Sequence, residues 1–463
     1  MPGLLQLSII ATLWAAFAGA QTTVTVQLGT TFQTMDGFGF SEAFGHANDL
    51  FNYPAAEQKQ VLDLLFSTTT GAGMTIIRNR IGSGGAGDSI LPTSPGCPTC
   101  TPQYSWDGSD GHQVWFSQQA MSYGVKTIYA DAWSAPGFMK TNGVETNGGT
   151  LCGVTGATCA SGDWKQAYAN FLTQYIKFYQ QSNVTITHVG FLNEPEYSPT
   201  YSSMNSNGQQ AADFIKVLSP TLAAAGLTRP SQARLTPPTN VWETEYADLS
   251  DPLLPNNWYS SGAAGEGLTW ANRIFDGIVN SRLSAYCYWI GAEPGTTNSA
   301  LILTSGTTVT PSKRLWAFAQ WSRYVRPGAV RLGTSGTGTN LKFSAFKNPD
   351  GSVSVQVINN GGSAATINVA TSGFTATSVQ GFVSAQGTDL GTLSVTLSSG
   401  VASGSVPAHA MATFLFNGTP GSTTTISSTS TVSTTSSSTT TSVSTTTTVS
   451  TPPTGCQSAE WGQ

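Results

Sequence analysis

The sequence is short of charge, and the charges it has are not gathered in one place. Only 9% of its 463 residues are Asp, Glu, Lys or Arg, the formal net charge is −5, and no cluster of Lys and Arg occurs. A protein that binds nucleic acid needs such a cluster to neutralise phosphates. The composition therefore argues against a nucleic-acid partner.

Long apolar runs are also lacking. The most apolar stretch, residues 4–17, is shorter than the about 20 residues that cross a bilayer, and it ends at Ala18-Gly19-Ala20. Small residues in that pattern are typical of a signal-peptidase site. We therefore expect a signal peptide over residues 1–20, a secreted, extracellular protein and no membrane partner. The usual basic segment before the run is missing, so an uncleaved anchor is the alternative.

Cysteine is too scarce, at six residues, to build a disulfide scaffold in a chain of this length. Cys152 and Cys159 lie in one Gly-rich loop, where we expect them to pair. Cys97 and Cys100 have a spacing seen in zinc and redox sites, but no second pair of ligands accompanies them. We therefore expect no metal. Cys287 lies in an apolar run and is predicted to be a buried free thiol.

No Gly-rich fingerprint opens the first helix, which argues against a nucleotide-binding doubly wound sheet and against a cofactor of that kind. Residues 32–325 nevertheless alternate apolar strands with amphipathic helices, a pattern that favours an α/β fold with a β/α barrel. The predicted strands are 34–40, 74–81, 126–131, 185–192, 241–246 and 285–290, and the predicted helices are 54–66, 112–123, 164–180, 209–225, 267–279 and 313–324.

The pattern changes at residue 326. Short alternating runs separated by Gly, Asn-Gly and Asp-Gly turns predict a β-sandwich side domain over residues 326–417, whose first strand is supplied by residues 21–31. Residues 418–454 are almost entirely Ser and Thr and predict an O-glycosylated linker, followed by residues 455–463. The predicted sandwich strands are 341–346, 352–358, 366–369, 375–383, 393–397 and 411–416.

Two glutamates occupy positions suited to catalysis. Active sites of β/α barrels lie at the carboxyl ends of the strands, where Glu194 and Glu245 both fall. Glycoside hydrolysis needs two carboxyl groups. Either residue alone fits an ordinary ion pair, but Trp133 and Trp289 at other strand ends suit a saccharide cleft, because indole rings pack on sugar C–H faces. Trp289 fits a core position equally well.

Three further features accompany this pair. Arg78, near the end of the second predicted strand, suits either sugar binding, support of a catalytic carboxylate, or a purely structural ion pair. Glu243 shares a strand face with Glu245 one layer deeper, where we expect it to be protonated or paired. Asn183 and Asn417 begin Asn-x-Thr triplets, which accept N-glycans in secreted proteins.

Five motifs, taken together, resemble glycoside hydrolase family 30, with the greatest likeness to its fungal subfamily 7 xylanases. The resemblance covers about residues 22–417, and the tail from Gly455 resembles the beginning of a family 1 cellulose-binding module. The motifs are MDGFGFSEAF at 35–44, RNRIG at 78–82, DAWSAP at 131–136, NEP at 193–195 and WETE at 242–245.

The resemblance implies a (β/α)8-type barrel with a β-sandwich side domain and cleavage with retention of configuration. It implies that Glu194 is the acid/base and Glu245 the nucleophile. Asn193 is then expected to contact the 2-hydroxyl of the sugar, while Trp133 and Trp289 line the cleft.

The chain departs from the family pattern between the two glutamates. In the family these residues end strands 4 and 7, roughly 90 residues apart at about 30 residues per βα unit, whereas 51 residues separate them here. Residues 228–240 contain three prolines and no apolar run. We therefore predict that strands 5 and 6 of the barrel are absent through a missing segment of about 40 residues. Open sheet edges would impair folding or activity.

A second departure concerns specificity. Xylanases of this subfamily that recognise glucuronic acid branches often carry Arg where this chain has His46, and His holds a carboxylate only when it is protonated. The sequence thus predicts a monomeric hydrolase of β-1,4-xylan or glucuronoxylan, with glucuronoxylan less favoured. The alternatives are β-1,6-glucanase, β-1,6-galactanase or glucosylceramidase-like activity, or a carbohydrate-binding protein impaired by the deletion.

Overall fold

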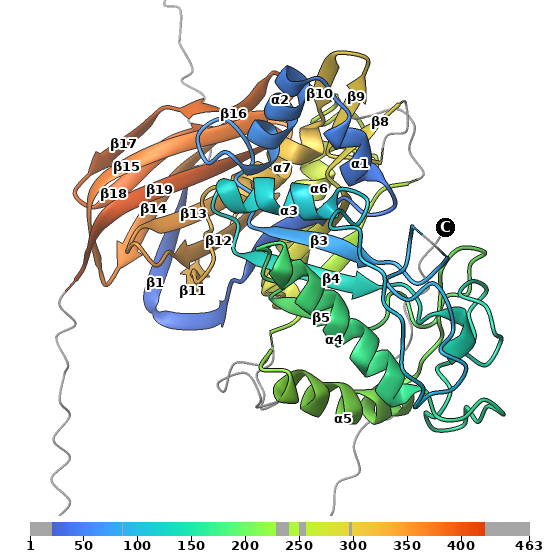
Figure 1. The fold of residues 1–463 in the computed structure, drawn as a ribbon. Helices are drawn as coiled ribbons and strands as arrows, with labels where there is room; N and C mark the ends of the chain where they lie inside the picture. Colours follow the sequence, from blue (N-terminus) through green and yellow to red (C-terminus); the bar gives the residue numbers. More distant parts are fainter. Residues whose placement is uncertain (1–20, 86, 228–239, 250–255, 296–298, 422–463) are drawn as a thin grey trace, which may run out of the picture. The chain divides into compact units, whose positions relative to one another are not determined.

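The structure is a computed structural model that describes residues 21–85, 87–227, 240–249, 256–295 and 299–421. Within these residues a parallel sheet surrounded by helices is followed by a β-sandwich, and Figure 1 colours the chain from β1 in blue to β19 in red. The predicted signal peptide and tail, and all but the start of the predicted linker, lie outside the described residues.

The parallel sheet contains the six strands predicted from apolar runs, in the order β5-β4-β3-β2-β7-β6. All of its pairings are parallel. Strands buried on both faces read as continuous apolar runs, which is why the prediction found them. The sheet consists of β2 (Gly37–Ser41), β3 (Ile76–Ile81), β4 (Thr127–Ala132), β5 (His188–Gly190), β6 (Trp242–Tyr246) and β7 (Ala285–Ile290).

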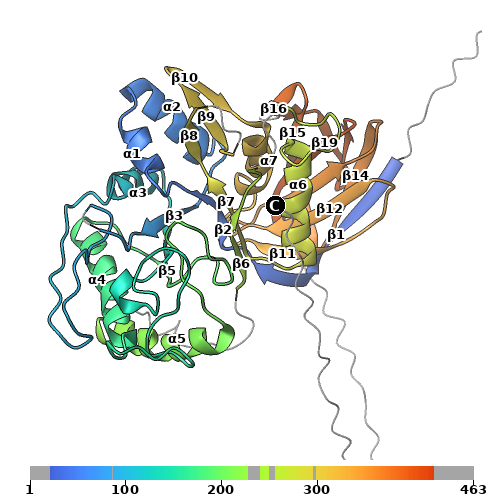
Figure 2. The ribbon, with the colours of Figure 1, turned by 90° about the vertical axis from the view of Figure 1, so that its right-hand side faces the viewer.

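The six predicted helices are present, and a short helix after β2 was not predicted. The predicted helix 267–279 changes to a π-helical turn, η2 (Asp276–Asn280), after Phe275. Helices α4 and α5 lie side by side in Figures 1 and 2, where Gln166 donates to Thr221 at 3.0 Å. The helices are α1 (His46–Phe51), α2 (Ala55–Phe66), α3 (Gln113–Ser122), η1 (Gly137–Met139), α4 (Lys165–Gln181), α5 (Gly208–Ala224), α6 (Gly267–Phe275) and α7 (Lys313–Ser322).

Within the described residues the sheet is open between β5 and β6, as the predicted loss of two strands requires. Figure 2 shows β7 beside both β2 and β6, and among the described residues no strand lies beyond β6 or β5. The segment 228–240 lies outside the described residues except for Asn240. Residues of both edges line a cavity of about 530 Å³. The ring of His188 lies 4.5 Å from that of Trp242, so side chains connect the edges.

A small sheet after β7 was not predicted, because its strands are only three or four residues long. It consists of β8 (Ala292–Pro294), β9 (Ile302–Ser305) and β10 (Thr308–Pro311). The chain then enters α7, most of which is buried.

The β-sandwich is one ten-stranded ladder whose ends fold over a common apolar core. Strand β1 (Gln21–Thr34) pairs with β11 and β14, in agreement with the prediction that the N-terminal strand belongs to this domain. The remaining strands are β11 (Val330–Ser335), β12 (Leu341–Lys347), β13 (Val353–Asn359), β14 (Ala365–Ser372), β15 (Phe374–Ala385), β16 (Thr388–Leu393), β17 (Val395–Ser398), β18 (Val401–Val406) and β19 (Ala410–Pro420).

One predicted sandwich strand is wrong. Residues 393–397 were predicted as a single strand, but β16 ends at Leu393 and pairs with β15, whereas β17 begins at Val395 and pairs with β18. Both residues pack toward the same core, so the alternation of apolar residues continues across the break and conceals it. Strands β11 and β18 were missed.

Helix α7 joins the sandwich to the domain that contains the parallel sheet. The buried Gln320 donates to Ser384 Oγ at 3.0 Å and accepts from Thr413 Oγ1 at 2.6 Å. Nearby, Trp258 Nε1 donates to the carbonyl of His409 at 2.7 Å. The two domains therefore share buried hydrogen bonds as well as apolar contacts.

Four cysteines of the described residues form two disulfides. Cys152 and Cys159, the pair predicted from the sequence, form a disulfide, and Cys97 and Cys100 form a second. Cys287 is free and buried, and burial raises the pKa of its thiol to about 12. In the described part of the chain no cluster of His, Cys, Asp and Glu is placed to hold a metal. None of its helices is long and apolar enough to cross a bilayer.

Candidate active site

The two glutamates predicted to be catalytic come from the two edges of the open sheet. Glu194 lies four residues after β5, and Glu245 lies within β6. The backbone N–H of Asn193 donates to the carbonyl of Ala132 at 2.8 Å, which holds the Glu194 segment against the end of β4. Glycine at 190 is required here, because a Cβ would come within 2.1 Å of Asp131 Oδ1.

Arg78, on β3 in the middle of the sheet, connects these edges. Its Nη1 forms an ion pair with Glu245 Oε2, while its Nη2 donates to Asp131 Oδ2 at 2.7 Å and to Asn193 Oδ1 at 2.6 Å. The Arg78 side chain has no accessible surface. The prediction that Arg78 binds substrate is therefore corrected: a buried guanidinium cannot touch a sugar, and Arg78 supports the carboxylates instead.

Glu194 completes this network. Asn193 Nδ2 donates to Glu194 Oε2 at 3.3 Å, and Glu194 adopts a left-handed backbone with φ of 41°. A non-glycine residue in this region is strained, and such strain collects at functional sites. Partial burial and the charge of Glu245 raise the pKa of Glu194 against the opposing effect of Arg78. The charge of Glu245 thus reaches Glu194 and contributes to the raised pKa of that carboxyl.

Aromatic rings surround the network. The ring of Trp133 lies 4.4 Å from the Arg78 guanidinium and 5.7 Å from the ring of Trp289. Trp133 is only 3% exposed, so it supports the site, whereas Trp289 is half-buried and offers surface to a ligand. Phe44, which is 44% exposed, packs edge-on against Trp133. An aromatic wall therefore stands beside the two acids.

Comparison with known proteins identifies the family. Residues 21–234 match the model of O-Glycosyl hydrolase family 30, and residues 328–414 match that of the Glycosyl hydrolase family 30 beta sandwich domain. The chain is 48% identical to the catalytic domain of GH30 xylanase C from Talaromyces cellulolyticus, with a TM-score of 0.81 over 85% of this chain and all of that one. The chain belongs to glycoside hydrolase family 30.

Two curated relatives differ in their activities. The chain is 23% identical to an endo-1,6-beta-D-glucanase from Neurospora crassa, over 71% of this chain and 79% of that protein. It is 24% identical to a glucuronoxylanase from Bacillus subtilis, over 66% of this chain and 77% of that protein. The family 30 chain is therefore an O-glycosyl hydrolase with a barrel-like catalytic domain and a C-terminal β-sandwich.

Near the site of this family 30 hydrolase, the side chain of Asn79 faces a helix, and His46 lies at the start of another. Asn79 donates to Ser117 Oγ on α3 at 2.9 Å, because successive side chains of a strand point to opposite faces. His46, predicted to contact substrate, begins α1, with its Nδ1 3.6 Å from Asp49 Oδ2. It does not line the nearby cavity that its neighbours Phe44 and Gly45 line.

The remaining predicted positions behave as follows. Burial and the charge of Glu245 raise the pKa of Glu243, as expected for an acid one layer deeper. The side chains of Asn183 and Asn417 are both exposed, and Asn417 Nδ2 donates to Ser378 Oγ at 3.3 Å.

Three site residues were not singled out from the sequence. Asp131 holds Arg78, and Phe44 and Tyr201 extend the aromatic wall, with their ring centroids 6.3 Å apart. Asp131 and Phe44 lie in the quoted family motifs, so the motifs carried a signal for them. Tyr201 lies in a loop with no motif, and only the tertiary structure reveals its position.

Proposed function

We propose that the chain is a secreted retaining glycoside hydrolase that cleaves β-1,4-xylan by double displacement. The observation that carries the proposal is the convergence of Glu194 and Glu245 on one network centred on the buried Arg78. Likeness to a xylanase at 48% identity supports xylan as the substrate. The exposed Asn183 and Asn417 acceptors agree with secretion.

In this mechanism Glu245 is the nucleophile. Its carboxylate attacks the anomeric carbon and forms a glycosyl ester while the glycosidic oxygen leaves. Arg78 orients the carboxylate through its ion pair and does not touch the substrate. The buried partner Asp131 in turn fixes Arg78.

Glu194 is the acid/base. It donates a proton to the departing oxygen in the first step, and the upward shift of its pKa is the direction that suits this role. As a carboxylate it then takes a proton from the water that cleaves the ester, which restores both groups. Asn193, whose Nδ2 donates to Glu194 Oε2, contacts the 2-hydroxyl of the sugar in the proposed complex.

A second candidate activity is cleavage of β-1,6-glucan, which is favoured by the likeness to the endo-1,6-glucanase at 23% identity. Release of reducing sugar from linear xylan, from β-1,6-glucan and from β-1,6-galactan by the full chain separates these activities. Retention of a polysaccharide without any released sugar supports the carbohydrate-binding alternative.

The test of the mechanism replaces each acid with its amide. We expect Glu245→Gln and Glu194→Gln to lower kcat on the preferred polysaccharide by about 10³-fold or more, since each removes one chemical step. Glu196→Gln, two residues from the acid/base and exposed, is the control. NMR of the first-formed product should show retention. Unchanged turnover in either variant, or an inverted product, contradicts the mechanism.

A further inference from the structure

A cavity of about 520 Å³ lies beside the catalytic network and shares its aromatic wall. Phe44 and Tyr201, each 44% exposed, line this cavity. The ring of Phe44 also lies 5.2 Å from that of Trp133 and 5.9 Å from that of Trp289. A ligand that crosses the two acids can therefore continue into the cavity along the face of Phe44. We call this cavity the Arg80 pocket.

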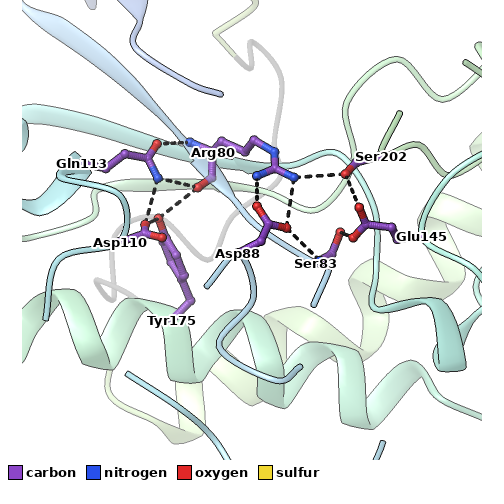
Figure 3. Close-up of polar contacts among 9 residues, drawn as sticks. Arg80, Ser83, Asp88, Asp110, Gln113, Glu145, Tyr175 and Ser202 are labelled. Atoms are coloured by element: carbon purple, nitrogen blue, oxygen red, sulfur yellow. Dashed lines mark hydrogen bonds and ion pairs between the residues drawn. The ribbon is translucent and has the colours of Figure 1, made fainter. Parts of the chain in front are cut away.

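The polar wall of the Arg80 pocket is a closed network, shown in Figure 3. Arg80 lies under Phe44, with the guanidinium carbon 4.5 Å from the ring centroid, and forms an ion pair with Asp88. Its Nη2 also donates to Ser202 Oγ at 3.0 Å, and Ser202 donates to Glu145 Oε1 at 3.0 Å. Both Nη atoms of Arg80 are therefore engaged by protein side chains.

Glycines shape the pocket. A Cβ on Gly45, Gly85 or Gly111 would meet no atom within 4 Å, so bare backbone leaves open space there. At Gly84, by contrast, a Cβ would lie 2.7 Å from Glu145 Oε2 and 2.9 Å from an Asp88 oxygen. Glycine at that position lets two carboxylates approach the backbone, where the Gly84 amide donates to Asp88 Oδ2 at 2.8 Å.

The pocket is rich in acceptors and poor in positive charge. Among the described residues that line it, three are carboxyl-bearing (Asp88, Asp110 and Glu145) and Arg80 is the one cation. Hydroxyl groups of a neutral sugar can donate to such carboxylates, and the C–H faces of the ring can pack on Phe44 and Tyr201. A sugar that carries its own carboxylate would meet like charge and no free guanidinium.

We propose that the Arg80 pocket is a further sugar-binding subsite that accepts a neutral pyranose and rejects a residue bearing a uronic acid. The subsite rests on the proposed function, because it binds a neighbouring unit of the chain that Glu194 and Glu245 cleave. It determines specificity through the charge of Glu145, which Arg80 reaches only through Ser202, and through the aromatic faces.

The test measures binding by calorimetry in the full chain carrying Glu245→Gln, so that no turnover occurs. The ligands are a linear xylo-oligosaccharide, the same oligosaccharide with a glucuronic acid branch, and a linear β-1,6-gluco-oligosaccharide. We expect the unbranched ligand of the preferred linkage to bind at least about 10-fold more tightly than the branched one. Adding Tyr201→Ala should weaken binding of the unbranched ligand about 5- to 10-fold.

Two controls sharpen the result. The first control is Phe32→Ala in the sandwich. Phe32 is 37% exposed, and its ring centroid lies 3.9 Å from the guanidinium carbon of Arg331, so it resembles an aromatic ring of the pocket. Its removal should leave ligand binding unchanged. The second control, Glu145→Gln, keeps an oxygen that accepts from Ser202 but removes the negative charge. It should reduce the difference in affinity between the unbranched and the glucuronic acid-branched oligosaccharide. Equal binding of both xylo-oligosaccharides before mutation, or equal effects of Tyr201→Ala and Phe32→Ala, overturns the proposal.

The subsite and the proposed function fail separately. Selective binding by the Arg80 pocket in a chain that releases no sugar from any polysaccharide overturns the hydrolase mechanism and leaves the subsite standing. Normal hydrolysis without the preference for neutral ligands overturns the subsite alone.

Discussion

The middle of the parallel sheet and its two open edges are built differently. Strands β2, β3, β4 and β7 each have a hydrogen-bonded neighbour on both sides. Strand β3 carries Arg78, which pairs with the buried Asp131, and Arg80, which pairs with the partly exposed Asp88. Strands β5 and β6 are paired on one side only within the described residues. Yet both proposed catalytic groups, Glu194 and Glu245, come from these edges.

The difference shows what sets the separation of the two carboxyl groups. No backbone ladder in the described structure joins β5 directly to β6, so the pairing of neighbouring strands does not fix this separation. Arg78 provides the connection instead, directly to Glu245 and through Asn193 to Glu194. Catalytic geometry at the edges should therefore depend on a residue from the middle.

Removing Arg78 should have the largest effect. Arg78→Ala leaves the buried Asp131 without its cation and releases both edges, which should cost about 3–5 kcal/mol of unfolding free energy and at least about 10³-fold in kcat. Denaturant unfolding and turnover by the full chain measure the two effects.

Two variants show whether this effect depends on the connection between the edges. Arg331→Ala removes a sandwich arginine that covers Phe32 and donates to Gln33 at 2.9 Å, and it should leave kcat unchanged. Arg78→Lys keeps the charge but cannot hold two partners with one planar fork, so it should recover stability more than activity. If Arg78→Ala retained the parent kcat, the positions of Glu194 and Glu245 would not depend on Arg78.

The same comparison explains what sequence reasoning could find. Buried parallel strands left apolar runs, so β7 was predicted residue for residue and β4 within one residue at each end. Glu194 and Glu245 were found because acids at strand ends are conspicuous beside such runs. The open edge was found because the family resemblance made 51 residues too few for three βα units.

The contacts that cross the sheet could not be predicted in this way. Arg78 was considered for three roles, and only its lack of accessible surface distinguishes support of the carboxylates from sugar binding. Trp133 was predicted to line the cleft but packs over Arg78, almost covered. The position of Tyr201 depends on how distant loops meet, which no local pattern encodes.

The buried support of β3 should also be visible as a pH dependence of stability. Asp110 accepts from Tyr175 and Tyr179 at 2.6 Å and from Gln113, which is itself bonded to the Arg80 backbone. Burial raises the pKa of Asp110 from 3.8 to about 6 despite these bonds. The folded-state pKa lies above the unfolded one, so protonated Asp110 contributes to the unfolding free energy. This contribution is fully present below about pH 3.8 and is lost as pH rises through about 6.

Asp110→Asn should therefore remove about 2 kcal/mol of the loss in unfolding free energy between pH 4 and 6. Denaturant unfolding across this range measures the slope. Asp389→Asn, which removes a carboxylate from the sandwich surface near Lys313, should leave the slope unchanged. An identical slope in the parent and in Asp110→Asn would show that the Asp110 carboxyl does not cause the pH dependence of stability.

The smallest effect should come from the edge itself. Trp242 anchors β6 by donating from Nε1 to Asp36 Oδ2 at 2.7 Å, and Asp36 also accepts from Asn240 at 2.8 Å. Trp242→Phe keeps an aromatic ring beside His188 and leaves Asp36 with one donor, so it should cost only about 0.5–1 kcal/mol of unfolding free energy.

Trp258→Phe is the matched variant in the closed core, where an indole of 0% exposure donates to His409 O at the same 2.7 Å. It leaves the partly buried His409 carbonyl without this donor and should cost about 1–3 kcal/mol in the same unfolding measurement. Equal costs would mean that the open edge is held as firmly as the core, and the distinction between middle and edge would then have no energetic basis.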